Sequence, residues 1–165
     1  MRSARCGRRE LRKKQVCIDA SVALKLVVGE KDSEKARALW RQWAYGGVRV
    51  IAPPLLVFEC VSALRRMVVR GDLDGEEAVA ARDQLLTMPI HLSSPRSLFT
   101  RAWDLATELQ RPQVYDSFYL AVAELLDTPL WTADERFSNA AAGRAGHRVR
   151  LLRAFSAASA EDEQR

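Results

Sequence analysis

Val16-Cys17-Ile18-Asp19 is the part of the chain from which its architecture can be inferred, and Ala20-Ser21-Val22-Ala23-Leu24-Lys25 follows it. Three consecutive apolar residues are typical of a short strand buried on both faces, because a strand with one exposed face would alternate apolar and polar residues. This strand ends at a carboxylate. Ligands of helix-covered sheets bind beyond the carboxyl ends of the strands, so we interpret Asp19 as the first member of an acidic site.

The length and composition of the chain favour one domain. With 165 residues, 48% of them hydrophobic, the chain can build one full core, whereas two halves would each be marginally stable. No apolar run reaches the roughly 20 residues of a membrane span, and the N-terminus lacks the apolar stretch of a signal peptide. We therefore expect a soluble, cytoplasmic protein.

The cysteines and histidines do not form a metal-binding or disulfide pattern. Cys6, Cys17 and Cys60 are odd in number and show no CxxC spacing, while His91 and His147 are isolated. Neither disulfides nor zinc are expected. The same scarcity argues against histidine-based acid and base chemistry or a serine triad, although residues distant in sequence can meet in a fold. Carboxylates remain as the candidate catalytic groups.

The formal charge of +5 and the isoelectric point near 9.4 suggest an anionic partner, but the charge is concentrated at one end. Residues 1–15 hold seven Lys or Arg residues and one Glu, a net charge of +6 that leaves −1 for the remaining chain. Such an arm can contact RNA phosphates, or it is a disordered leader without a function of its own. We expect a disordered arm at 1–15, one domain at 16–155 and a frayed tail at 156–165.

Short strands and helices alternate along the chain. Apolar residues at spacings of three and four predict helices, and short apolar runs between Gly and Pro breaks predict strands. The predicted strands cover residues 16–18, 48–52, 90–92, 130–132 and 149–152, and the predicted helices cover 21–28, 33–45, 55–70, 74–88, 95–109, 114–126 and 135–142. This order predicts an α/β fold with three layers, in which a short, mainly parallel sheet of about five strands lies between helices.

Three helix starts carry local signals. Asp32 or Ser33 can cap the helix that follows, and Asp74 with Glu77 three residues later resembles a capping box. Ser94-Pro95 predicts a further helix start, because Pro is favoured at the first helical position.

Glu59 lies inside the predicted helix 55–70, and its neighbours at spacings of three and four are Leu55, Leu56, Ser62 and Ala63. It therefore shares the apolar face of that helix. Burying a lone carboxylate costs several kcal/mol or shifts its pKa, so this side chain needs a cation or a hydrogen-bond donor. A structural ion pair is the alternative interpretation.

Two further acids stand at predicted helix starts. Asp116 opens one helix and Asp134 precedes another, and either residue considered alone could be a simple N-cap. In combination the four acids form a pattern, because Asp19 and Asp134 end strands, Asp116 begins a helix and Glu59 points inward from another. Hard oxygen ligands of this kind suit Mg²⁺ or Mn²⁺.

The residues around these acids resemble the four acidic motifs of PIN-domain ribonucleases, especially VapC toxins. The motifs are Asp19-Ala20-Ser21-Val22-Ala23-Leu24-Lys25, the Pro53-Pro54 entry to Glu59, Tyr115-Asp116-Ser117-Phe118-Tyr119-Leu120-Ala121-Val122-Ala123-Glu124, and Trp131-Thr132-Ala133-Asp134-Glu135-Arg136-Phe137. The match spans about residues 16–155, and the four motifs in this order are a specific signal although each is weak alone. The chain departs from the family in its long basic leader and in Trp131, which stands where an aliphatic residue is usual.

The resemblance implies a three-layer α/β/α nuclease domain whose acids converge on Mg²⁺ or Mn²⁺ and hydrolyse single-stranded or looped RNA. We expect Asp19 and Asp116 to bind the ion directly. Glu59 and Asp134 would then hold water molecules around the ion, and one of them could orient the attacking water.

Six further side chains are candidates for supporting roles. Ser21 and Thr132 are nearby polar helpers, with a helix-capping hydroxyl and an ordinary strand residue as the respective alternatives. The candidates for phosphate contacts, which are otherwise plain solvated charges, are Lys25, Arg65, Arg66 and Arg136.

The resemblance also implies a cognate antitoxin protein as partner. A homodimer is expected as well, because the apolar side chains on the helices between residues 55 and 88 exceed what one sheet layer can cover. They include Met67, Val68, Val69 and Val79.

Other classes of protein fit the sequence less well. A phosphatase with an aspartyl nucleophile would need a second Asp two residues after Asp19, where Ser21 stands, and a receiver-type signalling domain would need acidic neighbours at the first strand end. The serious alternative is a non-catalytic RNA-binding or protein-interaction module on the same fold. Metal-dependent cleavage with and without EDTA separates the two.

Overall fold

A computed structural model describes residues 14–156 of the chain. The predicted basic arm and tail lie outside the described residues, apart from Lys14, Gln15 and Ser156. Gln15 is part of the first strand, because its backbone pairs with Arg49 of the second strand. The first strand therefore begins one residue before the predicted strand 16–18.

Five parallel strands form one sheet, as predicted. They are β1 (Gln15–Ile18), β2 (Arg49–Ala52), β3 (Ile90–Leu92), β4 (Leu130–Thr132) and β5 (Val149–Leu151), and their order across the sheet is β3-β2-β1-β4-β5. The chain first builds outward from β1 to β3 and then returns to place β4 on the other side of β1. In open parallel sheets such a reversal leaves a crevice at the carboxyl ends of the two strands concerned, here β1 and β4.

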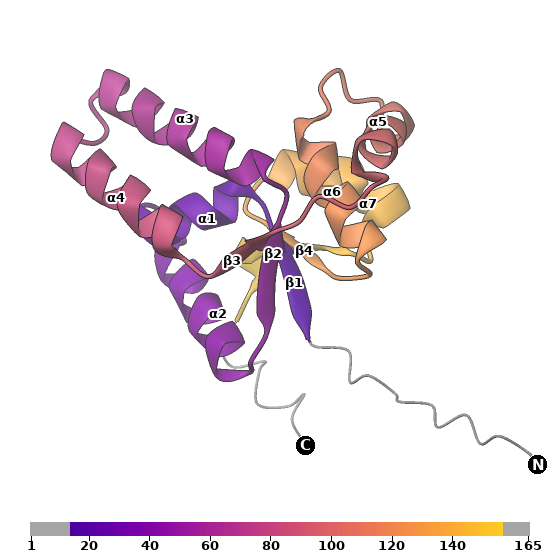
Figure 1. The fold of residues 1–165 in the computed structure, drawn as a ribbon, viewed down its shortest axis with the longest axis horizontal. Coiled ribbons are helices and arrows are strands. Elements are labelled where there is room, and N and C mark those ends of the chain that lie inside the picture. Colours follow the sequence, from indigo (N-terminus) through magenta and orange to yellow (C-terminus); the bar gives the residue numbers. More distant parts are fainter. Residues whose placement is uncertain (1–13, 157–165) are drawn as a thin grey trace, which may run out of the picture.

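Seven α-helices and one 3₁₀ turn surround the sheet in the described part of the chain. They are α1 (Ala20–Val27), α2 (Ser33–Tyr45), α3 (Leu55–Arg70), α4 (Gly75–Thr87), α5 (Leu98–Glu108), α6 (Tyr115–Leu125), α7 (Glu135–Ala145) and η1 (Leu152–Ala154). Helices α1 to α4 lie on one side of the sheet and α5 to α7 on the other (Figure 1). The predicted three-layer α/β/α architecture is confirmed.

The core is centred on β1 and α6. Cys17 and Ile18 of β1 are completely buried, and residues 119–123 of α6 are at most 2% exposed. A helix that is apolar on all sides packs in the interior, and α6 does so against β1 and β4. Burial of each large side chain here contributes roughly 1.5–3 kcal/mol, so the position of the α6 N-terminus relative to the β1 end is rigidly held.

The Trp131 side chain packs on the face of the sheet that α2 covers. Its ring meets Trp43 of α2 edge-on at 5.9 Å between centroids and Phe155, which follows η1, at 6.1 Å. An aromatic residue in place of an aliphatic one at this strand position therefore joins the C-terminal turn to α2. The departure from the family pattern is structural, since the Trp131 ring packs on other aromatic rings while its backbone carbonyl accepts from the Asp19 N–H at 3.2 Å.

One predicted helix cap and one predicted helix start differ from the structure. Asp32 precedes α2 with a left-handed φ of 66° and makes no side-chain cap, while the Ser33 hydroxyl donates to the Val28 carbonyl and accepts from the Glu30 N–H. The helix predicted at Ser94-Pro95 begins only at Leu98, because Pro95 forms a preceding turn.

The third helix start agrees with its signal. Asp74 accepts from the Glu77 N–H at 2.7 Å, and the Glu77 carboxylate accepts from the Asp74 N–H at 3.0 Å. The predicted capping box is confirmed.

Cys17 and Cys60 are free and buried. None of the helices between residues 14 and 156 is long and apolar enough to cross a membrane.

Candidate active site

The four predicted acids gather where β1 and β4 end. Asp19 directly follows β1 and Asp134 follows β4, while Glu59 and Asp116 lie near the N-terminal ends of α3 and α6. These two helices approach the strand ends from opposite sides (Figure 1). Each acid thus reaches the site from a different element.

Asp19 is buried, with 8% of its surface exposed, and both of its carboxylate oxygens accept hydrogen bonds. Its Oδ1 accepts from the Ser21 hydroxyl at 2.6 Å and from the Val22 N–H at 3.0 Å, and its Oδ2 accepts from the Thr132 hydroxyl at 2.5 Å. Burial raises the pKa of Asp19 to about 6, although these hydrogen bonds favour the charged form and act in the opposite direction. A nearby cation would stabilise this carboxylate.

Ser21 and Thr132, the two predicted helpers, both contact Asp19 and tie it to the loop after β4. The Ser21 hydroxyl accepts from the Ala133 N–H at 2.8 Å, and the Thr132 hydroxyl accepts from the Asp134 N–H at 2.9 Å. Since each hydroxyl accepts from that loop, its own hydrogen is directed to Asp19. The two hydroxyls therefore orient the carboxylate.

Glu59 is half-buried on α3 and receives a hydrogen bond from the Tyr119 hydroxyl of α6. The pKa of Glu59 is raised, first by burial, then by the charge of Asp116, while Tyr119 and the more distant Arg66 lower it. Sequence reasoning treated Tyr119 only as an apolar helix residue. Its spacing of three from Asp116 was the available signal, because both residues then share one face of α6.

Asp116 is not a helix cap. The N-cap of α6 is Val114, and Asp116 is the second residue of the helix. Its Oδ2 accepts from Nη2 of Arg111 at 3.1 Å. Burial raises the pKa of Asp116, Arg111 lowers it and Asp134 raises it. Sequence reasoning used Arg111 only as a helix break and missed this contact.

Asp134 does cap the helix after it. Its Oδ1 accepts from the N–H groups of Arg136 and Phe137 at 2.8 and 3.1 Å. The simple capping interpretation is therefore correct for Asp134 and wrong for Asp116. Asp134 nevertheless stays close enough to raise the pKa of Asp116.

Asp116 interacts electrostatically with each of the other three acids. Its carboxylate raises the pKa of both Asp19 and Glu59, and its own pKa is raised by Asp134. Mutual repulsion of this kind is relieved by a shared cation.

The donor set fits a divalent ion that keeps part of its water shell. Within residues 14–156, no group of three or more His, Cys, Asp or Glu side chains is close enough to hold an ion by direct contact. Mg²⁺ does not need one, because it prefers oxygen and usually binds through one or two carboxylates while keeping several waters. Asp19 and Asp116 are the candidates for such a pair.

The four residues predicted to contact phosphates have different surroundings. Lys25 donates to the Lys31 carbonyl at 2.8 Å and pairs with Glu30 at 3.3 Å, so it holds the loop after α1. Arg66 is close enough to Glu59 to lower its pKa. Arg136 is exposed on α7, and Arg65 lies on the far side of α3 from the acids, in the groove described next.

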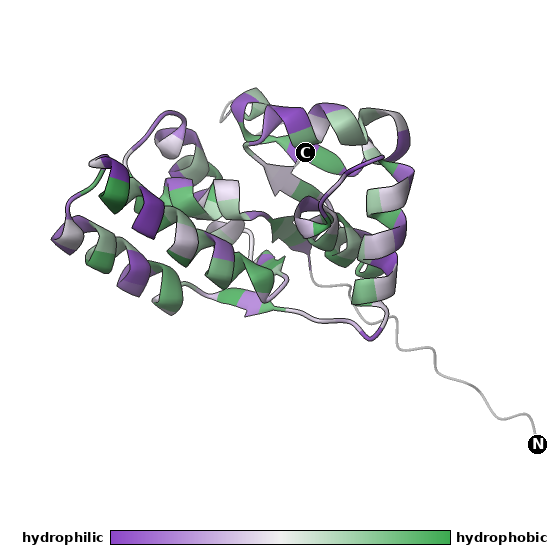
Figure 2. Ribbon diagram, turned by 90° about the horizontal axis from the view of Figure 1, so that it is seen from above, coloured by the Kyte–Doolittle hydropathy of each residue, from purple (hydrophilic) through white to green (hydrophobic). Residues whose placement is uncertain are grey.

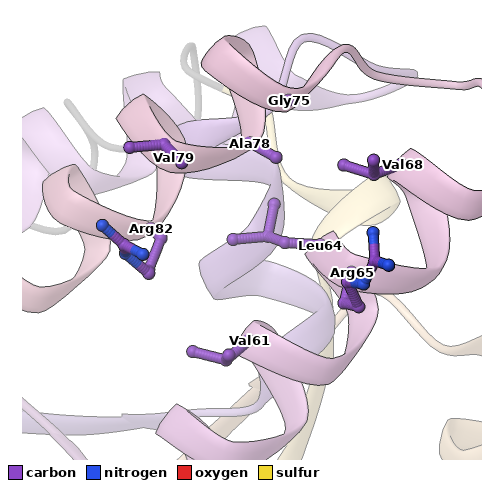
Figure 3. A pocket seen from close by; sticks show the side chains of 8 residues that line it. All are labelled: Val61, Leu64, Arg65, Val68, Gly75, Ala78, Val79 and Arg82. Carbon is purple, nitrogen blue, oxygen red and sulfur yellow. The ribbon is translucent and has the colours of Figure 1, made fainter.

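A groove of about 230 Å³ lies between α3 and α4, away from the acids. Figure 3 shows its apolar floor with an arginine at each side, from α3 and from α4. The lining residues are Val61, Leu64, Arg65, Val68, Gly75, Ala78, Val79 and Arg82. Both helices project beyond the sheet, and hydrophobic residues recur along them (Figure 2).

Comparisons with known proteins point to one family. The family model of the PIN domain matches residues 16–143. Ribonuclease VapC1 of Mycobacterium tuberculosis is 40% identical over 91 residues, which cover 54% of this chain and 65% of that relative, slightly less than two thirds of its length. Ribonuclease VapC3 of the same organism is 30% identical over 126 residues, covering 76% of this chain and 87% of that protein.

A solved structure agrees in fold. The crystal structure of Mycobacterium tuberculosis VapC20, described as a sarcin-ricin loop cleaving toxin, superposes with a TM-score of 0.57 at 20% identity. The superposition covers 76% of this chain and 94% of that one.

Proposed function

The chain belongs to the PIN domain family, and from this membership we propose that it is an endoribonuclease that hydrolyses RNA with Mg²⁺ or Mn²⁺. The observation that carries the proposal is the position of Asp116, whose charge acts on Asp19 and Glu59 and is itself acted on by Asp134. The names of the relatives support the substrate class, since they are ribonucleases. We further propose that the chain is the toxin of a toxin-antitoxin pair.

The proposed roles follow from what each side chain contacts. Asp19 and Asp116 would bind the ion directly, and Glu59 and Asp134 would act through water. A bound divalent ion neutralises phosphate charge and favours in-line attack by water. Ser21 and Thr132 keep both oxygens of Asp19 in place through their hydrogen bonds.

Tyr119 supports Glu59 in the same way. Its hydroxyl donates to Oε2, which leaves the remaining lone pairs of the carboxylate to accept from a water molecule. Glu59, with a pKa raised above its usual value, is then suited to orient the attacking water and to accept its proton.

The test is RNA cleavage by the purified chain with Mg²⁺, with Mn²⁺ and with EDTA. We expect cleavage with either ion and none with EDTA, and sequencing of the fragment 5′ ends will identify the RNA that is cut. Tight RNA binding without cleavage under any of these conditions would favour the non-catalytic module instead.

Two protein partners belong to this proposal. An antitoxin could place an apolar helix with acidic residues in the groove between α3 and α4, because Arg65 and Arg82 flank its apolar floor. A second copy of the chain could cover exposed apolar side chains elsewhere. We propose a cytoplasmic location, because the proposed RNA substrate is found there.

The residues expected at a homodimer surface on α3 and α4 are exposed in part. Met67 and Val68 are half-buried, whereas Val69 is 70% and Val79 47% exposed. Phe99 and Trp103 on α5 are each 69% exposed and lie one helical turn apart. We propose that this pair on α5, which the sequence did not single out, is the centre of the contact between copies.

A further inference from the structure

Arg111 carries the only positive charge that contacts any of the four carboxylates in the described part of the chain. Its Nη2 lies 3.1 Å from Oδ2 of Asp116. The other three acids are held by neutral donors, namely hydroxyl groups and backbone N–H groups. The guanidinium group therefore lies at the acid whose charge acts on Asp19 and Glu59 and which is itself acted on by Asp134.

The backbone of Arg111 is held in place while its side chain is open to solvent. Helix α5 ends in a Schellman motif, in which Gln110 has a left-handed φ of 51°, its N–H bonds to the Thr107 carbonyl, and the Arg111 N–H bonds to the Ala106 carbonyl at 2.8 Å. The Arg111 and Asp116 side chains are 33% and 38% exposed. The guanidinium group can thus change partner without movement of the main chain.

Resting on the nuclease function proposed above, we propose that Arg111 has two alternating partners. In the metal-free protein its guanidinium group holds the place of a cation on Asp116. When the divalent ion binds Asp116, the two positive charges repel, and Arg111 turns to a phosphate of the RNA. The planar guanidinium fork matches phosphate oxygens as well as it matches a carboxylate.

The contact between Arg111 and Asp116 differs from the structural ion pairs of the domain. The structural network of the domain is formed by Arg101, which bonds Glu124 at 2.7 Å and Glu108 at 3.0 Å, while Glu108 also pairs with Arg144 at 2.6 Å. That network joins three helices. Arg111 and Asp116 form a single bond within one loop and helix start, and exposed pairs of this kind are weak enough to exchange.

Metal titration without RNA tests the first partner. We expect Arg111→Gln to bind Mn²⁺ roughly fivefold more tightly than the parent in isothermal titration, because the ion no longer competes with the guanidinium group. Arg111→Lys, which keeps the charge, should stay close to the parent. Arg37→Gln is the matched control for loss of one positive charge, because Arg37 lies on α2 and pairs with Glu34, and it should leave Mn²⁺ affinity unchanged.

Steady-state kinetics at saturating Mn²⁺ tests the second partner. For a single-stranded RNA substrate, Arg111→Gln should raise KM about tenfold and reduce the slope of log KM against log salt by about 0.7, the value for one lost phosphate contact. Arg111→Lys should restore the slope. A residue that only supported the fold would not change the salt dependence.

Each failure has its own signature. Unchanged or weaker Mn²⁺ binding in Arg111→Gln, or an equal gain in Arg37→Gln, overturns the competition for Asp116. An unchanged salt slope overturns the phosphate contact. If the parent binds Mn²⁺ but cuts no RNA, the nuclease function fails together with the phosphate contact, while the titration still decides the competition.

Discussion

Tyr119 donates its hydroxyl hydrogen to Oε2 of Glu59 across a separation of 60 residues in the chain. Tyr119 is only 2% exposed and Glu59 is half-buried, so this bond between α6 and α3 is partly shielded from water. Hydrogen bonds to a charged acceptor are about twice as strong as neutral ones, and this one links the two helices that bring Glu59 and Asp116 to the site.

Tyr119→Phe should shift the pH dependence of cleavage. The bond favours the charged form of Glu59, so its loss raises the pKa of Glu59 further, and the acidic limb of the rate profile moves to higher pH. We also expect about a tenfold loss of kcat and a free energy of unfolding lower by about 1–2 kcal/mol. Tyr115→Phe, at a half-exposed position, is the control and should leave the profile in place.

Asp19→Asn and Glu59→Gln should each abolish cleavage, to below about 1% of the parent rate, because the ion or the attacking water is then misplaced. Asp104→Asn on the exposed face of α5 is a matched control. Gel assays with labelled RNA in Mg²⁺ measure all three variants. Cleavage that survives both substitutions, after contaminating nuclease is ruled out, contradicts the assignment of these acids.

The stability of the metal-free protein should depend on the protonation of Asp19. Its pKa is about 6 in the folded state, because of burial, and about 4 in the unfolded state. The folded state therefore binds more protons, and the contribution of Asp19 to stability is complete below pH 4 and is lost as pH rises through 6. This loss is roughly 3 kcal/mol for a shift of about two units.

Urea unfolding in EDTA between pH 4 and 7.5 measures this effect as a difference between the parent and Asp19→Asn. The free energy of unfolding of the parent should decline as pH rises, and that of Asp19→Asn should not. The difference in stability in favour of the variant should therefore grow with pH. Parallel curves for the two proteins would mean that Asp19 has an ordinary pKa in the fold.

Asp116→Asn should destroy activity and raise the melting temperature in EDTA. The pKa of Asp116 is raised overall although Arg111 opposes the shift, so its charge is net unfavourable in the folded state without metal. The group is partly exposed, so we expect a gain below about 1 kcal/mol, or roughly 2–4 °C. Mg²⁺ should then stabilise the parent far more than the variant.

Melting curves of both proteins in EDTA and in Mg²⁺ decide this point. A variant that melts below the parent in EDTA would show that the pair with Arg111 outweighs the repulsion among the acids.

Self-association should depend on α5. Light scattering of the parent at micromolar concentration should give about twice the monomer mass of 18.5 kDa. Trp103→Glu should give the monomer mass, because a charge at the centre of an apolar contact is strongly unfavourable, whereas Val69→Glu on α3 should remain dimeric. A monomeric parent contradicts the proposed dimer.

The strands, most of the helices and the element on which each of the four acids lies could be predicted from the sequence. Local patterns of neighbouring residues specify all of these features. The apolar run 16–18 predicts a buried strand wherever it lies, and Asp74 with Glu77 predicts its own capping box. Parallel pairing brings the carboxyl ends of β1 and β4 together, so Asp19 and Asp134, which were predicted to end strands, lie at one edge of the sheet.

The partner of each acid could not be predicted in the same way, because it is chosen by contacts between distant segments. Thr132 reaches Asp19 across 113 residues, and Tyr119 reaches Glu59 across 60. Asp116 and Asp134 have the same local appearance, yet only Asp134 caps a helix, because α6 begins at Tyr115, one residue before Asp116, whereas α7 begins after Asp134. Local patterns specify which residues can bind a cation, and the packing of α3 and α6 against the sheet specifies which donors reach them.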